Sequence, residues 1–114
     1  GAGVYSTGTL EVWGATIQNC SNDSTGGAIV VDAGTCTIGY TTRIINNTAY
    51  NGAAIYVPLE TSSCEIRSGE ISGNTSSSYA VIYGYWNTTP NETYNTDTVT
   101  FFGNVPLDID FAMP

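Results

Sequence analysis

The sequence predicts an all-β fold, a three-sided parallel β-helix in which short strands stack coil upon coil. Three observations predict it: a repeat of about 26 residues, three strand-like segments in each repeat, and a polar composition suited to strands and tight turns. The 114 residues include 13 Gly, 10 Asn, 10 Ser and 17 Thr. Apolar residues never recur at helical spacing for more than one turn, so no long helix is expected.

The first segment of each repeat carries an apolar residue at a fixed place. The steps between these four residues are 25, 26 and 27 positions. Because side chains alternate across a strand, we expect one row to point inward and the next to point outward. The inward row is Val4, Ile29, Ile55 and Ile82. The outward row, expected to be an exposed and largely aromatic contact surface, is Tyr5, Val30, Tyr56 and Tyr83.

Two further segments follow the first in every repeat, always in the same order. The second covers residues 10–12, 36–38, 64–66 and, with a weaker match, 98–100. The third covers residues 17–20, 44–47, 71–74 and 101–104. Its last position holds Asn47, Asn74 and Asn104 in three coils and Cys20 in the first. Stacked Asn side chains can hydrogen-bond from coil to coil, so the sequence predicts a structural Asn ladder.

The repeats fill most of a single domain, the organisation expected for a chain of this length. The four expected coils are residues 1–25, 26–51, 52–78 and 79–104, the last with a loop insertion at 86–97. Residues 105–114 are expected to form a C-terminal tail that pairs with another subunit. A β-sandwich is the structural alternative, but its strands would not recur as an ordered triplet at a nearly fixed period.

Two short motifs resemble the repeats of the polymorphic outer-membrane proteins of chlamydiae, and pectin-lyase-like proteins look similar at this level. Residues 26–29 read GGAI and match the family's GGA-[ILV] motif, and residues 101–104 match its FxxN motif. Residues 52–55 differ by one position, and Ile44 and Ile71 replace the Phe of FxxN. The resemblance covers nearly the whole chain. It implies a right-handed parallel β-helix that is displayed on a surface and acts in adhesion, and the four repeats predict about four coils.

The charge balance disfavours several functions. The chain has no His and only two basic residues, both Arg, against ten acids, a net charge of −8. This excludes the basic footprint of a nucleic-acid binder, and no apolar run is long enough for membrane insertion. We expect no enzyme, because no His or Lys can act as a base near neutral pH. The alternative is a polysaccharide-cleaving enzyme that uses acids such as Glu11, Glu65 and Glu70. No cofactor or metal is expected.

Glycosylation sequons indicate an extracellular protein. Asn-x-Ser/Thr occurs six times, more than twice the number expected by chance from the Asn, Ser and Thr content. We therefore expect N-linked glycans and an extracellular or cell-surface location. A β-helix rich in Asn, Ser and Thr could also generate such triplets without modification. The six acceptor positions are Asn19, Asn22, Asn46, Asn74, Asn87 and Asn91.

Two of the three cysteines occupy the same place in adjacent coils. Cys36 and Cys64 are expected to stack directly, with Cα atoms near 4.8 Å apart, which is within disulfide range. The sequence therefore predicts a Cys36–Cys64 bridge, with two buried thiols as the alternative. Cys20 is left over, either buried or linked to another chain.

The ends of the coil stack suggest a function. The chain starts directly in a coil, and the tail alternates apolar and acidic residues, so we expect the ends to be complementary. The alternative is that the chain is a piece cut from a longer solenoid. The primary prediction is an extracellular structural glycoprotein whose partner is itself, stacked head-to-tail into a filament or surface layer. The alternative is an adhesin module that binds carbohydrate or a receptor through the outward row. The expected end-to-end contact residues are Val4, Leu107, Ile109, Phe111 and Met113.

Overall fold

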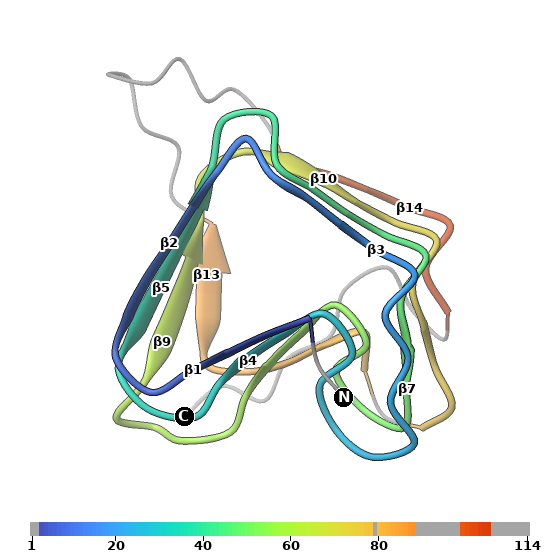
Figure 1. The fold of residues 1–114 in the computed structure, drawn as a ribbon, viewed down its shortest axis with the longest axis horizontal. Coiled ribbons are helices and arrows are strands. Elements are labelled where there is room, and N and C mark those ends of the chain that lie inside the picture. The colour runs from blue at the N-terminus through green and yellow to red at the C-terminus, as the bar shows by residue number, and fades with distance from the viewer. Residues whose placement is uncertain (1–2, 79, 89–98, 106–114) are drawn as a thin grey trace.

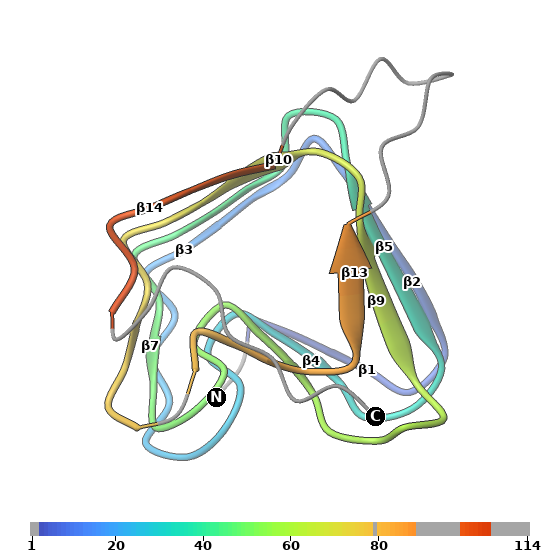
Figure 2. The ribbon, with the colours of Figure 1, turned by 180° about the vertical axis from the view of Figure 1, so that it is seen from behind.

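The computed structural model describes residues 3–78, 80–88 and 99–105, excluding the side chains of residues 87 and 88. They form a right-handed parallel β-helix, so the predicted fold is confirmed. Figure 1 looks down the stack of coils, and Figure 2 shows the stack from the opposite end. Every strand pairs in parallel with the equivalent strand of the next coil, and the described residues contain no helix.

The first sheet follows the predicted first segments. It contains β1 (Val4–Ser6), β4 (Ile29–Val31), β8 (Ile55–Val57) and β12 (Ile82–Gly84), in that order. The register pairs equivalent residues of successive coils, as the repeat predicts. The inward row is therefore continuous, and three of its four members are completely buried.

The second sheet follows the second segments in the first three coils but not in the fourth. It contains β2 (Thr9–Trp13), β5 (Thr35–Gly39), β9 (Ser63–Ile66) and β13 (Trp86–Thr88). The prediction that residues 98–100 supply the fourth strand is wrong, because Trp86 lies in register with Cys64. Trp86 fills the interior position that Cys or Leu fills in the other coils. The predicted loop insertion at 86–97 accordingly starts too early.

The third sheet contains β3 (Thr16–Gln18), β6 (Arg43–Ile45), β10 (Gly69–Ser72) and β14 (Val99–Phe102). Residues 99–100, predicted to belong to the second segment, are the start of β14. The inward rows of the three sheets meet in one core. Burial of one Ile side chain in such a core contributes about 1.5–3 kcal/mol. The completely or nearly completely buried Ile residues are Ile29, Ile38, Ile44, Ile55, Ile66, Ile71 and Ile82.

A short fourth side was not predicted from the sequence. β7 (Thr48–Ala49) pairs with β11 (Thr75–Ser76), and single bridges extend the ladder to Ser21 and Val105. After this side the chain turns back toward the first sheet, so the cross-section is a triangle with an added lobe (Figure 1). Two-residue strands have no alternation long enough to detect in a sequence.

A left-handed residue bends every coil between the third sheet and this fourth side. The four equivalent positions have φ values of 60°, 57°, 65° and 68° at Asn19, Asn46, Gly73 and Gly103. Gly and Asn are the residues that tolerate this backbone region best. The Asn-Asn and Gly-Asn pairs of the third segment are therefore a turn signal followed by the ladder residue.

Candidate functional site

The predicted outward row is in register but is not a continuous exposed surface. Tyr5, Val30, Tyr56 and Tyr83 pair in sequence through the first sheet. Tyr5 is 61% exposed, whereas Val30 is only 8% exposed. The Tyr56 and Tyr83 rings stack with centroids 5.6 Å apart and planes 15° apart, and both side chains are half-buried. The row is thus divided into one exposed Tyr and one stacked pair.

The lobe explains why Val30 is buried. The turn before β4 folds over the outer face of this strand, and a Cβ atom on Gly26 would lie 2.0 Å from Val30 Cγ2. Gly26 has a φ of 80°, so a glycine permits both the turn and the close approach. The expectation that Val30 is an exposed contact residue is wrong for this reason. Tyr5 lies beyond this cover, and its hydroxyl donates a hydrogen bond to Asp32, which raises the pKa of Tyr5.

The predicted Asn ladder is present. Asn47, Asn74 and Asn104 are buried, and each side chain links two coils. The Asn47 amide nitrogen donates to Asn74 Oδ1 at 2.9 Å, and that of Asn74 donates to Asn104 Oδ1 at 3.0 Å. The same amide groups also donate to the backbone carbonyls of Ile17 and Ile44. Because the side-chain amide groups are occupied by these hydrogen bonds between coils, the role of the ladder is structural.

This ladder removes one predicted glycosylation site. Asn74 is completely buried and its amide nitrogen donates two hydrogen bonds, so it cannot carry a glycan in the folded chain. Asn19 and Asn46 are exposed at the left-handed turn, whereas Asn22 is half-buried and donates to two backbone carbonyls. The Asn87 side chain and the whole of Asn91 lie outside the described residues. Glycosylation at these remaining positions stays a prediction.

Cys36 and Cys64 are in register as predicted, and both are buried. They are free thiols in the structure, so the predicted disulfide is not formed. In-register side chains of a parallel sheet point the same way, which keeps the Cβ atoms about 4.8 Å apart. A disulfide needs about 3.5–4.5 Å between these atoms. Cys20, half-buried, is also free.

The first coil exposes part of the apolar interior. Val4, Leu10 and Ile17 point inward but are only partly buried, whereas their counterparts in the next two coils are fully enclosed. β1, β2 and β3 each pair with one neighbouring strand within the described part of the chain, so one edge of each is open. The other predicted end-contact residues, Leu107, Ile109, Phe111 and Met113, lie outside the described residues.

The acids considered for catalysis are not adjacent. Glu11 and Glu65 point outward from the second sheet with Thr37 between them in the ladder, and Glu70 lies on the third sheet. Glu65 forms an ion pair with Arg67 at 2.7 Å. Glu70 accepts a hydrogen bond from Ser72 and faces Arg43, and these contacts lower the pKa of Glu70. Each of these carboxylates has a structural partner.

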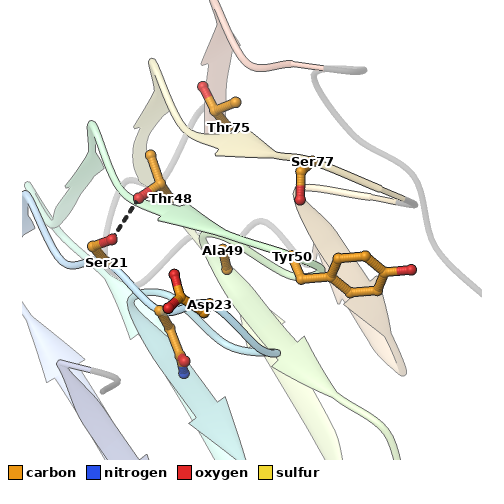
Figure 3. A pocket seen from close by; sticks show the side chains of 8 residues that line it. Ser21, Asp23, Thr48, Ala49, Tyr50, Thr75 and Ser77 are labelled. Carbon is orange, nitrogen blue, oxygen red and sulfur yellow. Dashed lines mark hydrogen bonds between the residues drawn. The ribbon is translucent and has the colours of Figure 1, made fainter.

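A shallow groove of about 260 Å³ lies along the fourth side (Figure 3). A row of hydroxyl groups crosses it, in which Thr48 Oγ1 and Ser21 Oγ are 3.1 Å apart. The groove presents hydroxyl, amide and carboxylate groups and no cationic side chain, so it disfavours anionic ligands. Sequence reasoning missed it because it depends on the unpredicted fourth side. Its lining is Ser21, Asn22, Asp23, Thr48, Ala49, Tyr50, Thr75 and Ser77.

Among the described residues, no group of three or more His, Cys, Asp and Glu side chains gathers closely enough to hold a metal ion. The same residues contain no helix that could cross a membrane. Comparison of the chain with protein-family models, curated proteins and solved structures found no significant match.

Proposed function

We propose that the protein is an extracellular structural subunit that stacks head-to-tail on further copies of itself, forming a filament or surface layer. The observation that carries the proposal is the partly exposed interior of the first coil. Val4, Leu10 and Ile17 each lose contact with water when one more coil covers them, as a second copy would. The backbone N–H and C=O groups at the open edges of β1, β2 and β3 can hydrogen-bond to such a coil and fix its register.

Two features of the sequence support the extracellular part of this proposal. Exposed Asn19 and Asn46 lie in sequons, where a glycan can be attached without disturbing the core. The GGAI and FxxN motifs resemble the repeats of chlamydial polymorphic outer-membrane proteins, a resemblance that implies surface display. Both features are compatible with a subunit that assembles outside the cell.

The test is sedimentation velocity and negative-stain electron microscopy of the unmodified chain over a range of concentrations. Stacking predicts filaments with an axial repeat of about 19 Å per subunit, four coils of about 4.8 Å each. Ile17→Asp places a charge in the stacking face and should prevent assembly. Gln18→Asp, with the same charge on the exposed neighbour in β3, should not. A monomer at every concentration would overturn self-stacking.

A second candidate function, binding of carbohydrate or a receptor, is favoured by the stacked rings of Tyr56 and Tyr83. Such a pair offers a rigid aromatic surface at a low cost in conformational entropy. Tyr56→Ala should abolish binding to a glycan array, while Tyr50→Ala, which removes a Tyr from the groove on the fourth side, should not. Equal binding by both variants contradicts a role for the pair.

A further inference from the structure

One corner of the second coil is longer than the corners above and below it. Ile38 and Arg43 have four residues between them, whereas the register-equivalent positions in the first and third coils have three. The extra residue lies in the turn between β5 and β6. In Figure 1 this turn is the green loop that rises beyond the neighbouring coils. The strands on both sides keep their register, so the extra residue changes only the corner.

Tyr40 stands at this corner in an unusual backbone conformation. Its φ is 55°, in the left-handed region that bulky residues rarely adopt. The equivalent position of the first coil is Gly14, with a φ of 79°. Tyr40 nevertheless leaves 49% of its surface exposed, so burial does not explain the choice of residue. Strain of this kind commonly accompanies a binding role.

The Tyr40 ring lies against Trp13 at the end of β2. The two ring centroids are 5.1 Å apart and the planes are tilted by 60°. The indole ring covers Gly39, because a Cβ atom on Gly39 would lie 2.2 Å from the six-membered ring of Trp13. A glycine at this place therefore allows the indole to lie over the neighbouring strand. Together the rings form a two-sided aromatic corner, partly open to solvent.

One fixed carboxylate, that of Glu11, borders the aromatic corner directly. Trp13 Nε1 donates to Glu11 Oε1 at 2.9 Å, which holds the indole and the carboxylate together. Two coils further, Glu65 Oε1 accepts from Arg67 Nε at 2.7 Å. These four residues bring two negative charges and one positive charge. The Glu11 carboxylate thus presents an oriented hydrogen-bond acceptor beside the rings. The net negative charge of the four residues disfavours an anionic ligand.

We propose that the Trp13–Tyr40 corner binds a neutral saccharide. Aromatic ring faces carry partial negative charge and attract the polarised C–H groups of one face of a sugar ring. The remaining lone pairs of the Glu11 carboxylate accept hydrogen bonds from sugar hydroxyl groups. The site differs from the Tyr56–Tyr83 pair on the first sheet and does not depend on filament formation.

The test uses the indole N–H resonances of the two Trp residues in a ¹⁵N-labelled sample of the full chain. Trp13→Phe identifies the Trp13 signal. The probes are glucose, galactose, mannose, N-acetylglucosamine and the β-linked trisaccharides of glucose and N-acetylglucosamine. At least one should shift the Trp13 signal saturably, while the buried Trp86 signal stays unchanged.

Tyr40→Gly removes the ring and suits the left-handed backbone, so this variant should fold and bind at least tenfold more weakly. Tyr50→Ala removes an exposed Tyr from the fourth side and should bind as the wild type does. Glucuronic acid should bind more weakly than glucose at low salt. The proposal is overturned if no probe shifts the Trp13 signal, or if Tyr40→Gly binds as tightly as the wild type.

Discussion

The side-chain oxygen of Asn74 accepts two hydrogen bonds from Asn47 in the preceding coil, one from the backbone N–H at 3.0 Å and one from the amide group at 2.9 Å. Asn104 accepts the same pair of bonds from Asn74. A single side chain thus satisfies the backbone of a left-handed turn and links two coils. The corner needs this because an unpaired buried N–H group costs about 1–3 kcal/mol.

Removing the middle of the ladder should destabilise the protein strongly. Asn74→Ala leaves both donors of Asn47 without their acceptor and frees the Ile44 carbonyl. We expect the free energy of unfolding to fall by about 2–4 kcal/mol, measured by urea denaturation. Asn46→Gly is the matched control at the exposed turn position. It should change the free energy of unfolding by less than about 0.5 kcal/mol. Equal effects of the two substitutions would contradict a structural ladder.

Close approach of strands at Gly84 should make this position intolerant of any side chain. Gly84 has a φ of 113°, and an added Cβ atom would lie 1.8 Å from the Val57 carbonyl oxygen. Gly84→Ala should therefore lower the midpoint of thermal unfolding by more than 10 °C, or prevent folding, because backbone must move. At Gly8 an added Cβ atom meets nothing within 4 Å, so Gly8→Ala should leave the midpoint within a few degrees of wild type.

Two buried serines should respond in opposite ways to the loss of their hydroxyl group. Ser76 Oγ donates to the Ala80 carbonyl at 2.8 Å and accepts from the Ala53 N–H at 3.0 Å. Ser62 Oγ is buried without a partner among the described residues. Ser76→Ala should cost about 1–3 kcal/mol in urea unfolding, whereas Ser62→Ala should be neutral or stabilising. A larger loss for Ser62→Ala would show that its hydroxyl is hydrogen-bonded.

The buried thiols should be unreactive in the folded state. The hydrogen bond to Cys36, together with burial, raises the pKa of the Cys64 thiol well above its usual range. The contribution of Cys64 to stability is therefore complete below about pH 8.5 and declines at higher pH, where this thiol ionises in the unfolded chain. Ellman's reagent should modify Cys20 first, and the other two only after unfolding. A total of one thiol in the unfolded chain would instead indicate a Cys36–Cys64 disulfide.

Periodicity in the sequence was sufficient to predict the three main sheets in the first three coils, because an equivalent apolar residue marks each of their strands. It did not predict β7 and β11, the two-residue strands of the fourth side. It failed at β13, where Trp86 takes a position held by Cys or Leu in the other coils. It also failed at Val30, because the cover over this residue comes from a turn that returns across the sheet. A contact made when a turn folds back over a sheet does not produce a periodic pattern in the sequence.

The aromatic corner was missed for a related reason. The corner that carries Tyr40 is one residue longer than its counterparts, and an alignment of the short strands alone does not reveal this difference. The sequence does show the difference, because the segment from Gly39 to Thr42 is one residue longer than the equivalent segments 13–15 and 67–69. A bulky residue where another coil has Gly14 would have been the second sign.

The number of residues at this corner differs among the four coils. Between register-equivalent strand positions, the passage from the second to the third sheet takes three residues in the first and third coils and four in the second. In the fourth coil eleven residues lie between the equivalent positions, Thr88 and Thr100. In every coil the strands before and after the corner still pair in register with a neighbouring coil. This corner is accordingly a natural graft position, where a foreign peptide or a new binding loop can be inserted while the coils around it keep their spacing.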